Sequence, residues 1–256
     1  PTGVELSGIF AEMRDHILQK DYPELDKKDL GDIYLLDGQD AVLAAMSTKS
    51  QKYTYKKLKE LGVKIMLNTL VTDFVEETVH LSNGNTIDAK NLIWAAGVSA
   101  RTFKGFKESS FGRGKRLKTN TYNLVEGYDN IYALGDCALI MGDKEYPDGH
   151  PQLAQPALQQ AKNLATNLLA KNGKWKPFAY KNKGSLAIIG RNKAVLDPPK
   201  ERFFVKGFLA WLIWIFVHIM GLVNFKNKVR TLYNWIGYYL YKDQYFRMII
   251  KPRERG

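Results

Sequence analysis

Apolar residues recur at three- and four-residue spacings in several segments of the chain, and this pattern predicts amphipathic helices. The first helix is predicted over residues 1 to about 20, and its apolar side chains share one face: Val4, Ile9, Phe10, Met13 and Ile17. A second is predicted over 47–62, which opens on Ser and Thr and closes on Gly. A third is predicted over 150–173, with Pro151 near its start and Gly173 as its stop.

Short apolar runs between these helices predict strands. They are "DIYLLDG", "VKIML", the alternating stretch over 70–90, "NLIWAAG", "YDNIYALGDCALI" and "GSLAIIGRNKAVLD". Within the alternating stretch, Asn83 and Gly84 form the strongest short-range hairpin signal. The order helix, strand, helix, strand, hairpin, strand is typical of a doubly wound unit with a β-excursion. The pattern therefore predicts the α/β fold class.

The last part of the chain differs in composition from the rest. Residues 207–223 are almost entirely apolar, with His218 as the one strongly polar side chain. Three interpretations compete: a membrane-spanning helix, a buried core helix, or a helix that lies on a membrane. We favour the last, because an amphipathic stretch with Lys and Arg follows, and because the region is rich in residues that prefer the membrane–water boundary: Trp211, Trp214, Trp235, Tyr233, Tyr238, Tyr239, Tyr241 and Tyr245.

The formal net charge of +12 indicates an anionic partner. Basic residues flank the Trp-rich run, which favours a membrane surface, and the chain carries no helix-turn-helix, RNA-binding or zinc-finger signature, so no nucleic-acid partner is expected. The one cysteine, Cys137, excludes an internal disulfide and a cysteine-built zinc site. The basic residues form two groups: one at 101–118, and one at Lys226, Lys228, Arg230, Lys242, Arg247, Lys251, Arg253 and Arg255.

Three local patterns are candidates for cofactor binding. Gly3 in "PTGVELSG" is similar to the end of a dinucleotide-binding glycine turn, and Asp37 ends a predicted strand where such a unit holds the ribose. Gly135 and Asp136 follow another strand, where an acid can bond a flavin. Each pattern has a plainer interpretation, since an Asp next to a Gly commonly caps a turn and a single Gly near a terminus can arise by chance. Gln155, near the start of the third helix, is equally open to a role as a solvent-facing helix former.

The ordered set "PTGVELSG", "NLIWAAGV", "NIYALGDCA", "LAQPALQQA" and the Trp-rich tail resembles type II NADH dehydrogenase, the single-subunit NADH:quinone oxidoreductase, over essentially all 256 residues. The resemblance implies a Rossmann-like flavoprotein with two dinucleotide-binding domains, truncated at its N-terminus, and a C-terminal amphipathic helical membrane-association region. It divides the chain into an NADH-binding domain at 1–98, part of the FAD-binding domain at 99–197 and the membrane-association region at 198–256. The FAD glycine turn would precede Pro1, so we expect a fragment that is inactive alone.

The resemblance also assigns roles to single residues. Gly3 would belong to the NADH turn, Asp37 would hold the NADH ribose, and Glu5 matches a carboxylate near the nicotinamide and quinone that could relay protons. Ala96 and Gly97 would form the turn against which NADH lies. Gly135 and Asp136 would bind FAD, and Ala154 and Gln155 would lie at the flavin where the quinone arrives. An alternative role for Glu5 is to stabilise the helix N-terminus through its charge.

The implied reaction is transfer of electrons from NADH through FAD to a membrane quinone. The implied location is peripheral, on the cytoplasmic face of the inner (plasma) membrane, and exposed apolar helices make a homodimer plausible. Two alternatives stay open at this point. A sulfide:quinone oxidoreductase would share the fold but needs a cysteine pair. A non-catalytic membrane-binding module would retain the nucleotide fold for stability alone.

Overall fold

The computed structural model describes residues 1–18, 21–26, 30–171, 173–199 and 203–241. The chain forms two compact units, one made of Pro1–Ala95 with the segment that begins at Gly184, and the other made of Ala96–Lys183. Each unit is described by itself. The basic residues between 242 and 255 and Tyr245, on which part of the expected membrane region depends, lie outside the described residues.

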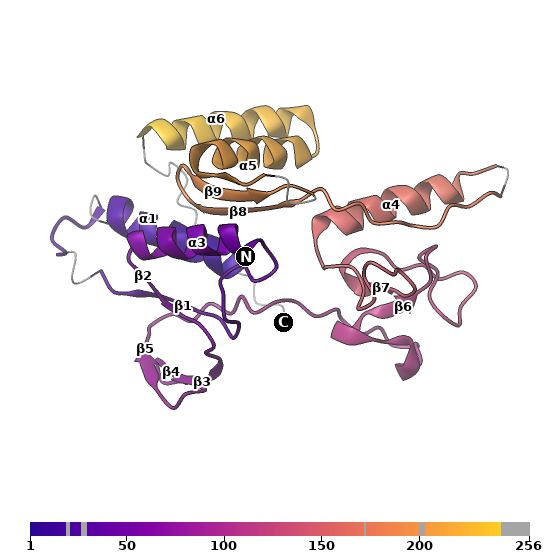
Figure 1. Cartoon of the computed structure of the whole chain (residues 1–256), viewed down its shortest axis with the longest axis horizontal. Coiled ribbons are helices and arrows are strands. Elements are labelled where there is room, and N and C mark those ends of the chain that lie inside the picture. The colour runs from indigo at the N-terminus through magenta and orange to yellow at the C-terminus, as the bar shows by residue number, and fades with distance from the viewer. Residues whose placement is uncertain (19–20, 27–29, 172, 200–202, 242–256) are drawn as a thin grey trace, which may run out of the picture. The chain divides into compact units, whose positions relative to one another are not determined.

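The first unit contains helices packed on short sheets (Figure 1). Its N-terminal elements are α1 (Thr2–Met13), a π-helical turn (Arg14–Leu18), β1 (Ile33–Leu36), α3 (Thr48–Glu60) and β2 (Val63–Met66). The β-excursion consists of β3 (Val71–Val75), β4 (Thr78–Leu81) and β5 (Thr86–Asp88). Its C-terminal elements are β8 (Ser185–Gly190), β9 (Lys193–Asp197), β10 (Val205–Lys206), α5 (Gly207–Gly221) and α6 (Phe225–Tyr241).

Three sheets organise this unit. β1 and β2 pair in parallel, with Ile33 opposite Val63. The excursion is an antiparallel sheet in the order β3-β4-β5, and its β4–β5 turn contains the predicted Asn83 and Gly84 pair. β8 lies at the edge of the third sheet, in the order β10-β9-β8. The main apolar core joins α1, α3, β2, β8 and β9: Val4, Ala11, Val42, Leu43, Leu58, Val63, Ala187, Ile189 and Val195.

Helix α1 lies against the edge strand β8 in a fixed register. The Glu5 carboxylate accepts a hydrogen bond of 3.3 Å from the backbone N–H of Ile188, and the Glu12 carboxylate accepts one of 2.6 Å from that of Arg191. Between them, a Cβ on Gly8 would lie only 1.7 Å from the carbonyl oxygen of Ile189. An edge strand presents backbone groups that need partners. Two carboxylates of α1 supply them, and a glycine between them allows the close approach.

Helix α3 begins where the sequence predicts. Ser47 is the N-cap residue and its hydroxyl accepts from the Ser50 N–H at 3.3 Å. The Asp197 carboxylate, at the end of β9, accepts hydrogen bonds from the Ser47 N–H at 2.6 Å, the Ser47 hydroxyl at 2.8 Å and the Ser50 hydroxyl at 2.7 Å. These bonds satisfy a donor group that a helix start leaves open. The bonds to Asp197 connect α3 to β9, and the local sequence around Ser47 does not predict them.

The second unit contains β6 (Leu117–Thr119), β7 (Ala138–Ile140) and α4 (Ala154–Leu168), with 3-10 turns at Glu108–Ser110, Arg113–Lys115 and Gly135–Cys137. β6 and β7 pair in parallel. One buried cluster joins Leu117, Val125, Ala133 and Ala138, and another joins Ile140, Phe178 and Tyr180.

Two of the predicted strands are wrong. In the part of the chain that the structure describes, "NLIWAAG" forms no strand, and Trp94 is 66% exposed. The sheet that it would extend has only β1 and β2, so these residues have no ladder partner there. The sequence predicts 128–134 as a strand running into Gly135, but among the described residues this segment forms no strand. Tyr132 forms only an isolated β-bridge, with Leu124. The third helix begins at Ala154, later than Pro151 indicated, and Pro156 lies in its first turn, where no backbone N–H is needed.

The close approach of α1 to β8 makes Gly8 sensitive to any side chain. Gly8→Ala should lower the free energy of unfolding by about 3 kcal/mol or more, because the added methyl collides with backbone and not with a movable side chain. Gly237→Ala in α6, where an added Cβ meets nothing within 4 Å, is the matched control and should not destabilise. Urea titration of both variants measures this. An unchanged midpoint for Gly8→Ala would contradict the fixed register.

Candidate functional site

The amino end of α1 meets the carboxyl end of the parallel β1–β2 sheet. Gly3, in the first turn of α1, packs on β1, and a Cβ there would lie 3.1 Å from Leu35 Cδ1. Asp37 follows β1 directly, and its backbone N–H donates to the Met66 carbonyl at 3.0 Å. The structure therefore brings Gly3 and Asp37 to the same edge of the sheet. This edge is where α/β folds hold nucleotides, because unpaired helix N–H groups favour anions.

Asp37 also performs the plainer role that its sequence position indicates. Its carboxylate accepts a hydrogen bond of 3.0 Å from the Gln39 N–H, and its carbonyl accepts one of 3.0 Å from the Thr69 N–H. The side chain is half-buried. The turn after β1 is thus fixed by Asp37 itself, which holds a carboxylate at the edge beside the start of α1.

Glu5 is a half-buried carboxyl in the first turn of α1. Burial raises the pKa of Glu5 above its ordinary value of 4.5, and the Ile188 hydrogen bond and the charge of His218 offset only part of that rise. Proximity to a helix N-terminus would by itself favour the charged form. Because desolvation dominates, this carboxyl retains a proton at higher pH than an exposed one does, which suits an acid–base group.

Ala96 and Gly97 lie in irregular, exposed backbone at the boundary between the two units. Gly97 has a φ of 96°, a conformation that L side chains rarely adopt, and a Cβ there would meet nothing within 4 Å. The glycine turn that the sequence predicts is present, but the described residues build no site around it.

In the second unit, the 3-10 turn of Gly135 and Asp136 packs against α4. The Gly135 N–H donates to Gln160 Oε1 at 2.6 Å, and Gln152 donates to the carbonyl of Asp136 at 2.9 Å. Gly135 has a φ of 69°, and a Cβ there would lie 3.2 Å from the Cβ of Ala157. The Asp136 side chain remains exposed. The turn is therefore held by its backbone while its carboxylate stays available.

Gln160 is a residue that sequence reasoning missed. It is almost completely buried, and it fixes the backbone N–H of Gly135 from 25 residues further along the chain. The sequence places Gln155, Gln159 and Gln160 near the start of one helix, where Gln is usually a solvent-facing helix former, so no local signal marked Gln160 as buried. Instead, Gln159 exchanges two hydrogen bonds of 3.0 Å with the backbone of Lys181.

Ala154 and Gln155 occupy the first turn of α4. Ala154 is exposed, and among the described residues no side chain caps this helix start. Gln155 is half-buried, and its Oε1 accepts from the Lys183 N–H at 3.1 Å and from the Tyr180 hydroxyl at 3.5 Å. These contacts orient the Gln155 amide. The helix start presents backbone N–H groups close to the Gly135 turn, an arrangement that favours an anionic group.

Buried side chains fix the segment that leads into α4. The Arg116 guanidinium donates to the carbonyls of His150 at 2.9 Å and Asp148 at 3.4 Å. The His150 ring, 3% exposed, contacts Asp143 Oδ2 at 2.9 Å. Burial alone would raise the pKa of Asp143, but the hydrogen bonds from His150 and the Glu145 N–H lower it below its ordinary value. The position of the α4 start thus depends on groups outside the helix.

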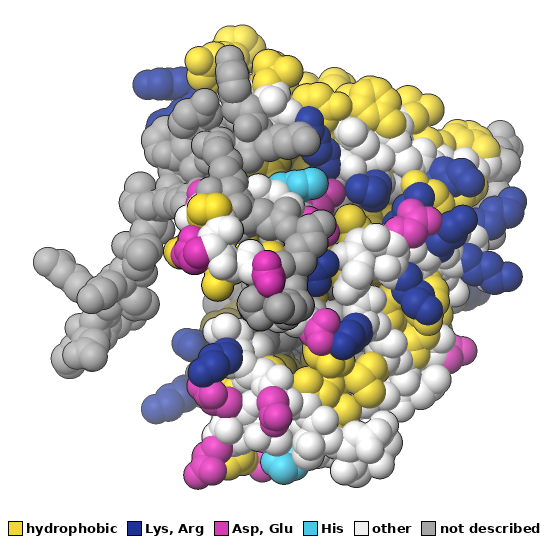
Figure 2. All heavy atoms as spheres, turned by 90° about the vertical axis from the view of Figure 1, so that its left-hand side faces the viewer, with side chains coloured by type: hydrophobic (Ala, Val, Ile, Leu, Met, Phe, Trp, Pro, Cys, Tyr) yellow, Lys and Arg dark blue, Asp and Glu magenta, His cyan; other side chains and the backbone are white. Residues whose placement is uncertain are grey.

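Helices α5 and α6 present an extended apolar surface. Figure 2 shows hydrophobic side chains gathered along its upper edge, where these helices lie, with Lys and Arg side chains below. Within the described residues, none of the helices has both the length and the apolar character to cross a membrane. The exposed apolar residues of the two helices are Phe208, Leu209, Leu212, Phe216, Val217, Met220, Phe225, Val229, Leu232, Tyr233, Ile236, Tyr238 and Leu240.

The three tryptophans of this region lie between the helices rather than on their outer face. Trp214 stacks on Trp235 with ring centroids 5.7 Å apart, and Trp211 contacts Tyr239 at 5.3 Å. All three tryptophans are half-buried. Their role in the structure is to join α5 to α6, so the outer face consists mainly of aliphatic residues and phenylalanine.

The raised pKa of Glu5 predicts a pH-dependent stability. Folding favours the protonated carboxyl, so the contribution of Glu5 is full below its unfolded-state pKa and is lost as the pH rises through its folded-state pKa. Glu5→Gln, which cannot ionise, should therefore gain stability relative to the wild type as the pH rises through that interval. Melting temperatures of both proteins between acid and neutral pH measure the difference.

Glu60→Gln is the matched control. The hydrogen bond from Lys57 lowers the pKa of Glu60, so this variant should gain nothing over the same pH interval. A Glu5→Gln variant that falls in stability relative to the wild type as the pH rises would show that the carboxylate form is favoured instead.

Comparisons with known proteins identify the family of this chain. Residues 1–161 match the family described as Pyridine nucleotide-disulphide oxidoreductase, and residues 182–242 match the NDH2 C-terminal domain. A type II NADH:quinone oxidoreductase, Ndh, of Mycobacterium tuberculosis is 35% identical over 92% of this chain and 51% of its own length. An internal alternative NAD(P)H-ubiquinone oxidoreductase of Arabidopsis thaliana mitochondria is 26% identical over 94% of this chain and 50% of its own.

A solved structure extends the likeness to the fold. NDH2 from Plasmodium falciparum, in complex with NADH, matches with a TM-score of 0.83 over 96% of this chain and 65% of that chain, at 21% identity. This likeness confirms the Rossmann-like α/β fold class. The chain spans about half the length of the curated relatives it matches. Because residues 1–161 match its model, the chain belongs to the pyridine nucleotide-disulphide oxidoreductase family, and its C-terminal segment is similar to the NDH2 C-terminal domain.

Proposed function

We propose that this chain is part of an FAD-dependent enzyme that transfers electrons from NADH to a membrane quinone. The observation that carries the proposal is the match to NADH:quinone oxidoreductases along 92% of the chain, including its C-terminal helices. The names of these relatives favour NADH and quinone over sulfide, and a catalytic role over a membrane-binding module. The proposal applies to the whole protein, of which the chain corresponds to about half the length of its relatives.

The first unit supplies features that fit NADH. Gly3 allows the start of α1 to approach β1, and Asp37 holds a carboxylate beside it at the same sheet edge. A carboxylate at this position can accept hydrogen bonds from ribose hydroxyls, and the helix start favours the pyrophosphate. In the proposed division, residues 1–98 bind NADH, with Ala96 and Gly97 as a turn against the dinucleotide.

The second unit supplies features that fit FAD. The Gly135 and Asp136 turn exposes a carboxylate beside the uncapped start of α4 at Ala154. We propose that residues 99–197 contribute this turn to the flavin site, and that Ala154 and Gln155 lie at the flavin. When bound, FAD supplies the hydride and electron-transfer chemistry, and the chain orients the reactants and excludes water.

Reduction of a quinone to a quinol consumes two electrons and two protons, so the site needs a proton source. Glu5 suits this role because burial raises its pKa, so that the carboxyl keeps its proton to a higher pH than an exposed carboxyl does. Ile188 fixes one oxygen of the carboxylate. Gln155 is proposed to orient the quinone, since its Oε1 is already fixed by Lys183 and Tyr180.

Residues 198–256 are proposed to bind the membrane surface. The outer face of α5 and α6 is apolar, with Phe216 65% exposed, and α6 carries Lys226, Lys228 and Arg230 with no acidic residue. Such a helix lies in the interface of a membrane with anionic lipids. We also propose a peripheral location on the cytoplasmic face. A homodimer that buries part of the same apolar face is an alternative role for that face.

The site assignments predict a loss of quinone reduction. In the full-length protein, Glu5→Gln should lower kcat about 100-fold if the carboxyl transfers a proton in the rate-limiting step. Gln155→Ala should raise KM for the quinone. NADH oxidation with a quinone acceptor measures both. Glu60→Gln and Gln159→Ala are matched controls, because Glu60 is an exposed acid and Gln159 bonds the adjacent Lys181 backbone. Equal losses in variants and controls would contradict these roles.

The membrane assignment predicts weaker lipid binding when the outer face of α5 becomes charged. Phe216→Glu should reduce partition into anionic liposomes at least about tenfold, because an apolar side chain is replaced by a negative charge. Val75→Glu, on the exposed face of β3, is the control and should leave partition unchanged. Liposome flotation of the full-length protein, with and without residues 200–256, provides the comparison. Equal flotation of the shortened protein would rule out this membrane-binding region.

A further inference from the structure

The β8–β9 turn connects two helices that are far apart in the sequence. Arg191, the first residue of this turn, donates from Nη2 to the backbone carbonyl of Tyr239 in α6. Its guanidinium also lies over the Tyr239 ring, 4.2 Å from the ring centroid. A planar guanidinium can stack on a ring and donate a hydrogen bond at the same time, which an ammonium cannot do with comparable geometry. Arg191 is therefore a two-point attachment for α6.

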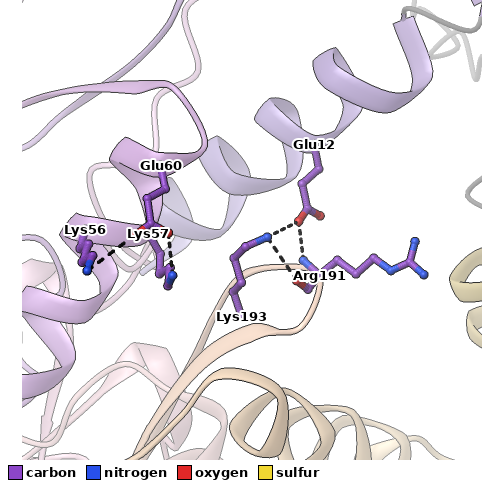
Figure 3. Close-up of polar contacts among 6 residues, drawn as sticks. All are labelled: Glu12, Lys56, Lys57, Glu60, Arg191 and Lys193. Atoms are coloured by element: carbon purple, nitrogen blue, oxygen red, sulfur yellow. Dashed lines mark hydrogen bonds and ion pairs between the residues drawn. The ribbon is translucent and has the colours of Figure 1, made fainter.

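The same turn is attached to α1 on its other side. Figure 3 shows Glu12 reaching from α1 to the turn, where its carboxylate meets the Arg191 N–H and the Lys193 ammonium. These contacts measure 2.6 Å and 3.5 Å. The Glu12 side chain is only 12% exposed, and a Cβ on Gly190 would come within 2.6 Å of its carboxylate oxygen. The turn thus lies close to α1, and a side chain on Gly190 would require the Glu12 carboxylate to shift.

These two attachments share one residue. The backbone of Arg191 bonds to α1, and its side chain bonds to α6. Glu5 lies on α1 seven residues before Glu12, about 10 Å along the helix. Helix α1 is bonded to β8 through Glu5 and to the β8–β9 turn through Glu12, so a displacement of α6 that moves Arg191 acts on the helix that carries Glu5.

We infer that Arg191 is a positioning residue that fixes the apolar helix α6 relative to α1 and so sets where a membrane-bound quinone meets Glu5. The expected effect on quinone reduction rests on the proposed function, but the contact between Arg191 and Tyr239 does not. The aromatic contacts of α6 with α5 hold the two helices together as a pair. The side chain of Arg191 joins this pair to the β8–β9 turn through its contacts with Tyr239.

A simple charge effect is the competing explanation. Arg191 is a cation near an apolar helix, and any cation there would attract anionic lipid. Arg230 on α6 offers the matched comparison, because Arg230→Met removes one positive charge from the apolar helix itself and leaves the contact between Arg191 and Tyr239 intact. Arg191→Lys keeps the charge and loses the planar donor, so the two variants separate charge from geometry.

The first test needs no activity. Amide hydrogen exchange of residues 232–241 is measured in the full-length protein for the wild type, Arg191→Met, Arg191→Lys and Arg230→Met. Exchange should accelerate about tenfold in both Arg191 variants and remain unchanged in Arg230→Met. Tyr239→Leu provides a second variant in case Arg191→Met fails to fold, and it should loosen the same segment. Unchanged exchange in Arg191→Met, or equal acceleration in Arg230→Met, would overturn the inference.

The second test addresses the consequence. In liposomes containing a lipophilic quinone, both Arg191 variants should raise the KM for that quinone about tenfold. Their kcat with a water-soluble acceptor should be unchanged. Arg230→Met should leave this KM unchanged. If the wild type reduces no quinone, the proposed function is wrong, while the exchange result still decides on the contact. If exchange accelerates but KM does not change, Arg191 holds α6 without positioning it for the reaction, and the inference is overturned.

Discussion

The contact between α1 and the edge strand β8 is the constraint on which the first unit depends. Glu5 accepts a hydrogen bond from the Ile188 N–H of β8, Glu12 accepts one from the Arg191 N–H in the turn that follows, and Gly8 lets the two backbones approach between them. Each carboxylate removes an unpaired donor, and the glycine allows a separation that no other residue would permit. Because three points fix one helix on one strand, α1 has little freedom to shift or rotate.

This constraint links structure to the proposed chemistry. The residue that satisfies the strand edge, Glu5, is also the half-buried carboxyl whose pKa is raised by burial. The same helix begins at Gly3 beside Asp37, where a nucleotide would bind, and ends near Glu12, where the β8–β9 turn connects to α6. One helix therefore carries the proposed nucleotide turn, the proposed proton donor and the attachment of the membrane-facing region.

The sequence predicted well the features that depend on neighbours along the chain. Ser47 as a helix cap, the turn at Gly84 and the helical run after residue 206 all follow from local chemistry. The strand predicted at Trp94 failed because a strand needs partners elsewhere in the sequence. The roles of Glu12 and Gln160 were likewise out of reach, since each depends on a backbone group 179 or 25 residues away. The candidate residues Ala96 and Gly97 remain predictions.

The central claim is that burial against β8 raises the pKa of Glu5 above that of an ordinary surface acid. A carbon-13 NMR titration of the Glu5 carboxyl in the full-length protein tests this directly, with Glu60 as the internal reference. We predict that Glu5 titrates above 4.5 and that Glu60 titrates below it, because burial acts on the first and Lys57 on the second. A Glu5 carboxyl that titrates at or below 4.5 would contradict the account.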